Sequence, residues 1–376
     1  MAEAPGFLFL NANTPWVYAL AQALSAHRST TALRLYDWPN YRRLKPQWPE
    51  TDSLTRRRMI VMPPGYAGRL EALFGVPMPL VFAGERGRLR RATGGAEPWV
   101  IACYPYLARW TRHVPGERLI YYNLDEYTFY EPHRSHLIRS LERELVERSA
   151  LTLCLSVEMV RRLRERHPDR AARIQHFPLG MVESFLNEAP DDLPIVNSIG
   201  YVGNLTNRVD WDFFHAVARR TPELRYAVVG KLDALAVGDD NGVWRARRAE
   251  TLALDNVDFL GSVPQAAVPN HYHRYAVNWM PYDVSHGFNV AACPTKIMDA
   301  IASGRPFLST DLPESRHYPN HIALATSAEE AAAKLRELAA KSASHDVAAQ
   351  VDFARGHSWA HRADTLIAMT NAANRG

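Results

Sequence analysis

Short apolar runs alternate with amphipathic segments through the second half of the chain, at the spacing of βα units. Six runs predict strands, at 198–203, 224–230, 256–261, 276–282, 305–310 and 321–326. Helices are predicted between them: WDFFHAVARR after Asp210, a short one from Val268 to Arg274, one from about Pro294 to Ser303, and SAEEAAAKLRELAAK, which starts with a Ser-x-x-Glu capping box. Strands that alternate with helices predict a parallel sheet covered on both faces, as in a Rossmann-like α/β domain.

The first half shows the same alternation less regularly. Strands are predicted at 7–12, 31–38, 58–64, 79–84, 99–105, 118–124 and 151–156. HLIRSLERELVERS (136–149) and SVEMVRRLRERH (156–167) have the apolar periodicity of amphipathic helices. The chain is therefore predicted to contain two Rossmann-like halves.

A Pro/Asp-rich stretch, EAPDDLPIVN (188–197), has the composition of a linker between these halves. We expect a first domain at 1–190, a second at 195–355 and a closing helix at 356–376 that packs back on the body. Two such domains facing each other would bring the carboxyl ends of both sheets to one cleft, where ligands of open α/β sheets bind.

Composition is that of a soluble globular protein, with 47% hydrophobic and 22% charged residues in a chain of 376. The net charge of +4 is too small to indicate a nucleic-acid partner. Positive charge is concentrated in the first hundred residues, in clusters at 42–45, 56–58 and 86–91. Such clusters are usually solvated loops; the sharper interpretation is a surface for anionic lipid headgroups or an anionic acceptor.

The three cysteines are far apart and lack the spacing of a disulfide framework or a zinc site, which indicates a reducing compartment. The N-terminal apolar run is only strand-length and no basic segment precedes it, so no signal peptide is predicted. No apolar run approaches the roughly 20 residues of a membrane span. We expect a cytoplasmic protein whose membrane contact, if any, is peripheral.

A lysine stands in the first turn of the helix predicted within ACPTKIMDAIASGRPFLST (291–309). Pro294 suits the start of that helix and Gly304 suits its end. A helix N-terminus already carries partial positive charge, so Lys296 in this place indicates a bound anion. The plainer interpretation is a solvated pair of Lys296 and Asp299, which share one stripe of the helix.

The loop in GYVGNLTNRVDWD begins at Gly203, at the end of a predicted strand, and leads to a helix from about Asp210. Glycine permits close backbone approach, and the helix start offers N–H groups to a phosphate, to which Arg208 would add a charged contact. A tight strand-helix turn produces the same pattern without a ligand. Tyr282 ends another strand of the same half, pointed toward the same cleft.

In LIYYNLDEYTFYEPH (119–133), a predicted strand delivers Asp125 and Glu126 beside four tyrosines. An ordinary aspartate is ionised at neutral pH and can accept a proton from an attacking hydroxyl group. Tyrosines around a carboxylate also suit carbohydrate. The plainer alternatives are an Asx-turn for Asp125 and a surface charge for Glu126. No metal-binding spacing such as HExxH is present, so no metal cofactor is expected.

Three blocks of the second half carry a family resemblance: GYVGNLTNRVDWDFFHAVARRTPELRYAVVG, NVDFLGSVPQAAVPNHYHRYAVNWMPY and PTKIMDAIASGRPFLST. Together they resemble the nucleotide-sugar half of GT-B glycosyltransferases. The last is similar to the Pro-x-Lys-x-x-Glu-x-x-Ala-x-Gly-x-Pro block of family 4-like enzymes, and HSWAHRADTL resembles the family's closing helix. The match spans roughly residues 195–370, while the first half matches only loosely. The resemblance implies a GT-B fold, with two Rossmann-like domains facing a central cleft.

One motif departs from the retaining enzymes of family 4, which usually carry Glu-x7-Glu where this chain has Ala291 and Asp299. The chain is more similar here to the xanthan glucuronosyltransferase type, an inverting GT-B enzyme. That type has a Pro-Tyr after the corresponding strand, a lysine on the donor helix and an aspartate after a first-domain strand. Tyr282, Lys296 and Asp125 fit these three positions.

The resemblance implies a role for each candidate residue. Asp125 would be the general base on the acceptor hydroxyl, with Glu126 and Tyr127 as further acceptor-side candidates. On the donor side, Gly203, Asn204 and Arg208 would border the diphosphate, Tyr282 and Lys296 would hold phosphate or sugar, and Asp299 would bind ribose or sugar hydroxyls.

These features predict a glycosyltransferase that moves a sugar from a nucleoside diphosphate sugar to an acceptor hydroxyl, with inversion and without a metal. The expected setting is bacterial cell-surface polysaccharide or glycoconjugate assembly at the inner face of the plasma membrane. The acceptor would be a sugar, a lipid-linked sugar or another glycoconjugate. The alternatives are a retaining GT-B transferase and a degenerate GT-B protein that binds a nucleotide sugar or a partner without catalysis.

Overall fold

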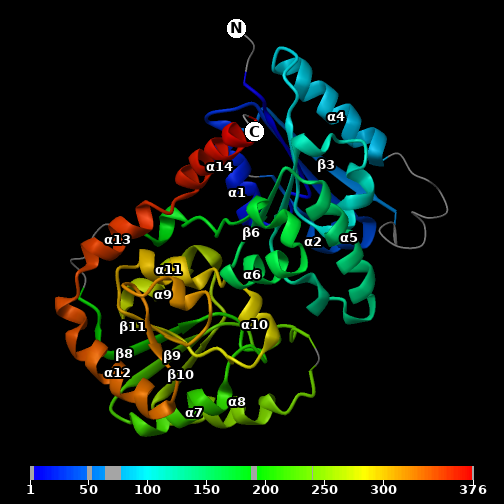
Figure 1. Ribbon diagram of the computed structural model, residues 1–376. Helices are drawn as coiled ribbons and strands as arrows, with labels where there is room; N and C mark the ends of the chain where they lie inside the picture. Colours follow the sequence, from blue (N-terminus) through cyan, green and yellow to red (C-terminus); the bar gives the residue numbers. More distant parts are fainter. Residues whose placement is uncertain (1–3, 49–52, 64–77, 188–192, 239, 375–376) are drawn as a thin grey trace. The chain divides into compact units, whose positions relative to one another are not determined.

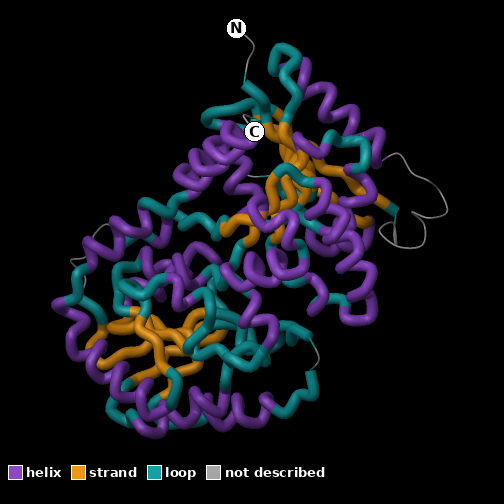
Figure 2. The backbone as a smooth tube through the Cα atoms, viewed as in Figure 1, coloured by secondary structure: helices purple, strands orange, loops and turns teal. Residues whose placement is uncertain are grey.

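The computed structural model describes residues 4–48, 53–63, 78–187, 193–238 and 240–374. The chain divides into two compact units: Met1–Leu155, Val160–Pro178 and Trp359–Gly376 form the first, and Ser156–Met159 and Leu179–Ser358 form the second. Each unit contains one sheet with helices packed around it (Figures 1 and 2). The predicted linker at 188–197 falls half outside the described residues, which resume at Leu193.

The sheet of the first unit has seven strands, all parallel, in the order β3-β2-β1-β4-β5-β6-β7. The strands are β1 (Phe7–Leu10), β2 (Thr30–Asp37), β3 (Arg56–Met62), β4 (Trp99–Ala102), β5 (Leu119–Asn123), β6 (Leu151–Cys154) and β7 (Ile174–His176). The helices of this part of the chain are α1 (Pro15–Ser25), α2 (Trp38–Leu44), α4 (Met78–Ala92), α5 (Ser135–Arg148) and α6 (Val157–Arg166). Helix α14 (Trp359–Ala373), from the far end of the sequence, packs against α1 in this unit (Figure 1).

The sheet of the second unit has six parallel strands in the order β10-β9-β8-β11-β12-β13. The strands are β8 (Ile195–Val202), β9 (Arg225–Val229), β10 (Val257–Gly261), β11 (Tyr275–Met280), β12 (Phe307–Thr310) and β13 (Ala323–Ala325). The helices are α7 (Trp211–Arg220), α8 (Trp244–Leu252), α9 (Val268–Arg274), α10 (Gly287–Ala291), α11 (Lys296–Ala302), α12 (Ala328–Lys341) and α13 (Val347–Arg355). Helix α7 packs against both α8 and α12, and α11 packs with α9 and α13.

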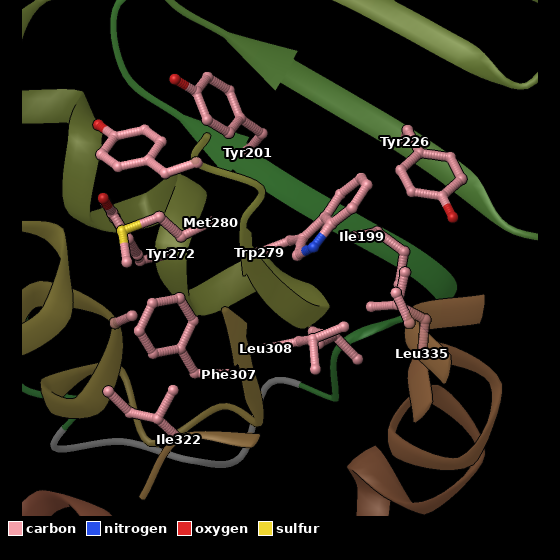
Figure 3. Packing of buried hydrophobic residues seen from close by; sticks show 14 of the residues in the cluster. Ile199, Tyr201, Tyr226, Tyr272, Trp279, Met280, Phe307, Leu308, Ile322 and Leu335 are labelled. Atoms are coloured by element: carbon pink, nitrogen blue, oxygen red, sulfur yellow. The ribbon is translucent and has the colours of Figure 1, made fainter. Parts of the chain in front are cut away.

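An aromatic cluster fills the core of the second unit. Trp279 of β11 meets Phe214 of α7 edge-on, with 4.6 Å between ring centroids, and lies 5.4 Å from the ring of Tyr226 of β9. Figure 3 shows Trp279 and Tyr226 beside Ile199 of β8, with Leu335 of α12 close to them. Burial of one such large side chain stabilises the fold by roughly 1.5–3 kcal/mol, so this cluster fixes the helices against the sheet.

Side-chain caps start two helices where the sequence predicts them. The carboxylate of Asp210 accepts a hydrogen bond from the Phe213 N–H at 2.9 Å and caps α7. Ser327 accepts one from the Glu330 N–H at 3.2 Å and caps α12. The Glu330 carboxylate reaches back to the N–H of Thr326, one residue earlier than in the usual capping box.

One predicted strand is wrong. Residues 79–84 belong to the first turns of α4, not to the sheet. The buried residues of α4 are Met78, Phe82, Glu85 and Leu89, which repeat at helical spacing. The short apolar run thus packs as one stripe of a helix that continues into the arginine-rich segment.

The arginine clusters at 56–58 and 86–91 also differ from the solvated loops that were the plainer expectation, because they lie on β3 and α4. Three of their side chains bind one buried carboxylate. Glu85, with 0% of its side chain exposed, accepts hydrogen bonds from Arg56, Arg58 and Arg88 at 2.9, 2.7 and 2.6 Å. An otherwise uncompensated buried charge is thus surrounded by cations.

Candidate functional site

The strand order of the second sheet reverses between β8 and β11, which is the place where open α/β sheets bind ligands at the carboxyl ends of their strands. Gly203 directly follows β8, and Tyr282 lies two residues after β11. The loops after these two strands are joined: the Asp283 N–H donates to the Arg208 carbonyl at 3.0 Å, and the Asp210 N–H donates to the Pro281 carbonyl at 2.9 Å. Several predicted donor-side residues therefore lie together at the switch point.

Gly203 has a backbone conformation and surroundings that favour glycine. Its φ is 153°, and a Cβ atom there would lie 2.5 Å from Nζ of Lys296. Its own N–H donates to the Val229 carbonyl at 2.8 Å. On the neighbouring strand end, a Cβ on Gly230 would collide with the Gly203 carbonyl. The close packing of the backbone brings the Lys296 ammonium group against the start of the 203–209 loop.

Lys296 is buried, with 8% of its surface exposed, so the interpretation as a solvated ion pair is wrong. Its Nζ lies 4.4 Å from the ring centroid of Tyr201 and 4.6 Å from that of Tyr282. Within the described part of the chain, this Nζ has no hydrogen-bond partner. Burial lowers the pKa of Lys296, against an opposing contribution from Tyr282. The ammonium group is thus held mainly against the two ring faces.

Arg208 approaches Tyr282 as a second cation. Its guanidinium carbon lies 4.7 Å from the ring centroid of Tyr282 and 4.7 Å from that of Phe288. Nε donates to the Asn289 side-chain oxygen at 2.8 Å, and the Asn289 amide donates back to the Arg208 carbonyl at 2.8 Å. Nη2 is buried and meets no acceptor among the residues that the structure describes.

The two cations change the pKa of the Tyr282 hydroxyl. Burial by itself would raise its pKa, but the charges of Lys296 and Arg208 outweigh that effect and lower the pKa to about 8. Two cations that favour an anion on Tyr282 would equally favour an anionic ligand beside it. Buried cations with free donors are suited to phosphate oxygens.

Asp299 and Asn204 lie at the edges of this group. Asp299 is one turn along α11 from Lys296 and is partly buried; burial raises its pKa to about 7, with Lys296 acting in the opposite direction. Asn204 is exposed, and its carbonyl accepts a hydrogen bond from the Tyr201 hydroxyl at 2.8 Å. The Asn204 backbone is thereby fixed next to Gly203, while its side chain faces solvent.

In the first unit, Asp125 follows β5 and is partly buried. Its Oδ1 accepts a hydrogen bond from the Glu126 N–H at 3.1 Å, and its Oδ2 accepts one from the Tyr130 hydroxyl at 2.6 Å. The hydrogen bond from the Glu126 N–H comes from the adjacent residue. The bond from the Tyr130 hydroxyl comes from a side chain five residues away and fixes the second carboxylate oxygen. The carboxylate lies at the carboxyl edge of the sheet, where a base would serve a ligand.

The two acceptor-side candidates next to Asp125 have structural partners. Glu126 is buried, not a surface charge: Oε1 accepts from the Thr128 hydroxyl at 2.6 Å, and Oε2 lies 3.9 Å from the Arg162 guanidinium. Tyr127 donates its hydroxyl hydrogen to the Cys103 carbonyl at 2.7 Å. Both side chains therefore hold the loop that carries Asp125.

Sequence reasoning missed several residues around Lys296 and Arg208 in the second unit and around Asp125 in the first unit. Tyr201 and Asn289 complete the surroundings of Lys296 and Arg208, and the pattern that could have revealed Tyr201 is its position two residues before Gly203 on the same strand face. In the first unit, Tyr104, Tyr106 and Arg134 bind the Glu131 carboxylate at 3.0, 3.2 and 3.2 Å. Only contacts between distant segments reveal that cluster.

Within the described ranges, no three His, Cys, Asp or Glu side chains come together as a metal site. None of the helices that the structure describes is both long and apolar enough to cross a bilayer.

A family model matches part of the second half of the chain. Residues 208–368 match a family model described as glycosyl transferase-like. TuaH of Bacillus subtilis (strain 168), named as a glycosyltransferase of teichuronic acid biosynthesis, is 22% identical over 189 residues, which cover 48% of this chain and 45% of TuaH. The match spans about half the length of that curated relative.

Similarity to solved structures extends over the whole chain. HepE of Anabaena, solved with UDP, is 14% identical with a TM-score of 0.69, over 98% of this chain and 100% of HepE. The same protein was also solved with UDP-glucose. Sucrose-phosphate synthase of Thermosynechococcus elongatus is 15% identical with a TM-score of 0.71, over 98% of both chains. Likeness at this identity concerns the fold, and the predicted GT-B fold is confirmed.

Proposed function

We propose that this chain, which belongs to the GT-B glycosyltransferases, transfers a sugar from a nucleoside diphosphate sugar to an acceptor hydroxyl group. The observation that carries the proposal is the pair of buried cations at the switch point of the second sheet. Lys296 and Arg208 both face the Tyr282 ring, and each has a buried nitrogen without an acceptor in the described residues. A diphosphate would supply those acceptors.

The donor would bind with its diphosphate against Gly203, Lys296 and Arg208. The backbone at Gly203 offers close approach, and the two cations offer charge-assisted hydrogen bonds. Asn204 would border the same group, and Tyr282 would contact phosphate or sugar. Asp299 would accept hydrogen bonds from ribose or sugar hydroxyls, with Lys296 beside it to favour its ionised form.

In the transfer step, the Asp125 carboxylate would take the proton of the acceptor hydroxyl. That oxygen forms a bond to the anomeric carbon while the bond from this carbon to the leaving phosphate oxygen breaks. The nucleoside diphosphate departs with the electron pair, and Lys296 and Arg208 stabilise its growing negative charge. A single displacement of this kind inverts the anomeric centre. With two cations at the leaving group, we propose that no metal ion is needed, and turnover should persist in EDTA.

The setting we propose is the assembly of a bacterial cell-surface polysaccharide or glycoconjugate, by analogy with the role named for TuaH. A surface of the first unit is suited to anionic lipid. Helix α2 has no buried residue, exposes Trp38 and Leu44 by 50% and 55%, and carries Arg42 and Arg43 in its last turn. Exposed apolar side chains beside cations favour a peripheral contact with the inner membrane face, where a lipid-linked acceptor would be found.

A thermal-shift panel of nucleoside diphosphates and nucleotide sugars tests the donor site. A ligand that binds only the folded state at a hundredfold excess over its Kd stabilises it by about 2.7 kcal/mol. We expect a higher unfolding midpoint with one nucleotide family, and no shift in Lys296→Ala. Arg336→Ala, at an exposed position of α12, is the control and should respond as wild type does. Equal shifts in wild type and Lys296→Ala would contradict the proposed site.

The alternatives differ in what Asp125 does. Asp125→Asn should abolish transfer in an inverting enzyme that uses this base, whereas a retaining transferase would keep substantial turnover and give product with the donor's anomeric configuration. A degenerate GT-B protein would bind nucleotide and form no product with any donor and acceptor pair. Anomer analysis of the product by NMR separates the first two.

A further inference from the structure

The segment after β5 is tied to the end of β4 at two places. Tyr127 donates its hydroxyl hydrogen to the Cys103 carbonyl, just beyond β4. Four residues later, the Glu131 carboxylate accepts hydrogen bonds from Tyr104 and Tyr106, which also follow β4. The backbone between these ties is a single 3-10 turn at Tyr127–Phe129, closed by the Tyr130 N–H on the Tyr127 carbonyl at 3.2 Å. Tyr130 is therefore held at both sides.

The Tyr130 side chain combines exposure with a strong hydrogen bond. Half of it, 51%, is exposed to solvent, yet its hydroxyl donates to Asp125 Oδ2 at 2.6 Å. That is the short distance of a charge-assisted O–H···O⁻ bond. Ordering an exposed side chain costs conformational entropy. Here the ring is held beside the proposed base with much of its surface uncovered.

We propose that Tyr130 forms the acceptor subsite: its hydroxyl positions the Asp125 carboxylate, and its exposed ring receives the apolar face of an acceptor pyranose. This inference rests on the proposed function and names a further substrate-contacting residue and the chemical class of the acceptor. A pyranose has C–H groups on one face that pack on an aromatic ring, with hydroxyls at its rim. A sugar packed on Tyr130 would present a rim hydroxyl to the carboxylate that Tyr130 holds.

The hydrogen bond also favours the ionised, proton-accepting form of Asp125. The charged side chains of this region pair with one another: Glu126 on the same loop with Arg162 of α6, and Glu131 with Arg134. Tyr130→Phe substitutes none of these four residues. A change in the pH profile of Tyr130→Phe therefore reports the loss of the Tyr130 hydroxyl.

The test compares Tyr130→Phe, Tyr130→Leu and the control Tyr41→Phe, which removes a hydroxyl from the partly exposed Tyr41 of α2. The donor is the nucleotide sugar that gives the largest thermal shift. The acceptors are water and octyl glucoside, galactoside and mannoside. Hydrolysis of the donor reports the Asp125 carboxylate without any acceptor sugar, and transfer to the octyl glycosides reports the ring.

For Tyr130→Phe we expect hydrolysis and transfer to fall about tenfold at the pH plateau, because the Asp125 carboxylate loses the hydrogen bond that positions it. The acid limb of both rate profiles should move to higher pH, and KM for the octyl glycoside should stay unchanged. Tyr130→Leu should in addition raise that KM about tenfold or more. Tyr41→Phe should behave as wild type.

Three results would overturn the inference. Rates within twofold of wild type and an unmoved acid limb in Tyr130→Phe would remove the positioning role. An unchanged KM in Tyr130→Leu, or wild-type hydrolysis of the donor without transfer to any octyl glycoside, would remove the pyranose subsite. The proposed function fails separately: it fails when Asp125→Asn retains full turnover or when no nucleotide shifts the unfolding midpoint.

Discussion

At the scale of single residues, Lys296 shows how a residue placed for a ligand can destabilise the folded protein when no ligand is bound. Its ammonium group is buried against two rings, without a hydrogen bond from Nζ to the described residues. Replacing a buried charge with an apolar side chain of similar length is often stabilising. Lys296→Met should therefore raise the free energy of unfolding of the ligand-free protein by roughly 1–2 kcal/mol in urea titrations, while it removes the response to nucleotide.

The pH dependence of this gain has a defined sign. The pKa of Lys296 is lowered in the folded state, so the unfolded state holds this proton more tightly. Stability of the wild type therefore rises with pH as the folded protein releases the proton first, and the advantage of Lys296→Met should shrink toward alkaline pH. A constant advantage across the titration would indicate a packing effect alone.

Gly203 gives a sharper test, because the atom nearest to a Cβ atom there is the Lys296 Nζ itself. In Gly203→Ala the new methyl group would meet Nζ of Lys296 at 2.5 Å and push it from its place. Nucleotide affinity should fall about tenfold or more, corresponding to about 1.4 kcal/mol. Gly261→Ala is the matched control: its φ is also positive, at 71°, but nothing lies within 4 Å of its Cβ. Calorimetric binding should show wild-type affinity in this control.

Tyr282 offers an optical readout of the same site. With a pKa of about 8, its hydroxyl should ionise well below the usual tyrosine value near 10. A spectrophotometric titration should show one early tyrosinate that is missing in Tyr282→Phe. In Lys296→Met the strongest opposing charge is lost, burial prevails, and this ionisation should move to higher pH. An early tyrosinate that persists in Lys296→Met would assign the shift to Arg208 alone.

At the scale of elements, Asp210 links the start of α7 to the loop that follows β11. Its side chain caps the helix, and its N–H binds the Pro281 carbonyl after β11. Asp210→Ala should lower the free energy of unfolding by about 1 kcal/mol, the usual cost of a lost N-cap. Asp210→Asn keeps an acceptor and removes a carboxyl group whose pKa burial raises, so chemical denaturation should show little loss. Equal losses in both variants would point to the charge instead of the cap.

Sequence patterns predicted correctly those helices and strands whose caps and apolar periodicity lie within one short segment. The caps at Asp210 and Ser327 are visible in sequence, and α9 spans Val268–Arg274 as predicted. The run at 79–84 misled because a few apolar residues fit a strand and one stripe of a helix equally well. The three-residue strand β7 (Ile174–His176) was missed because it is too short to show a period.

The candidate site was also predictable only in part: its charged residues could be found from motifs, but the contacts around them could not. Lys296 and Arg208 are identifiable from their motifs, but the depth of Lys296 depends on the Tyr201 and Tyr282 rings, which come from two different strands. The Asn289 bond that orients Arg208 joins positions 81 residues apart. No sequence period reports such a contact. The general-base role of Asp125 stays a prediction until the variant is measured.

At the scale of the whole molecule, the charge of the first unit leads to a binding prediction. The wild type should float with vesicles that contain phosphatidylserine at low salt and be released at high salt, since the attraction is screened. A variant with Trp38→Ser, Arg42→Glu and Arg43→Glu should stay at the bottom of the gradient. Reversing two exposed cations of the second unit, Arg336→Glu and Lys341→Glu, is the control. Flotation that survives the α2 changes would locate the contact elsewhere.

The return of α14 to the first unit has a consequence for the order in which the two units can fold during synthesis on the ribosome. Residues 179–358 form most of the second unit and emerge as one continuous stretch. The first unit starts earlier but lacks the helix that covers α1 until Trp359–Ala373 has been synthesised. Domains usually complete in the order of translation. By this order the unit that begins first would be completed last, and the part of α1 that α14 contacts would stay uncovered until then.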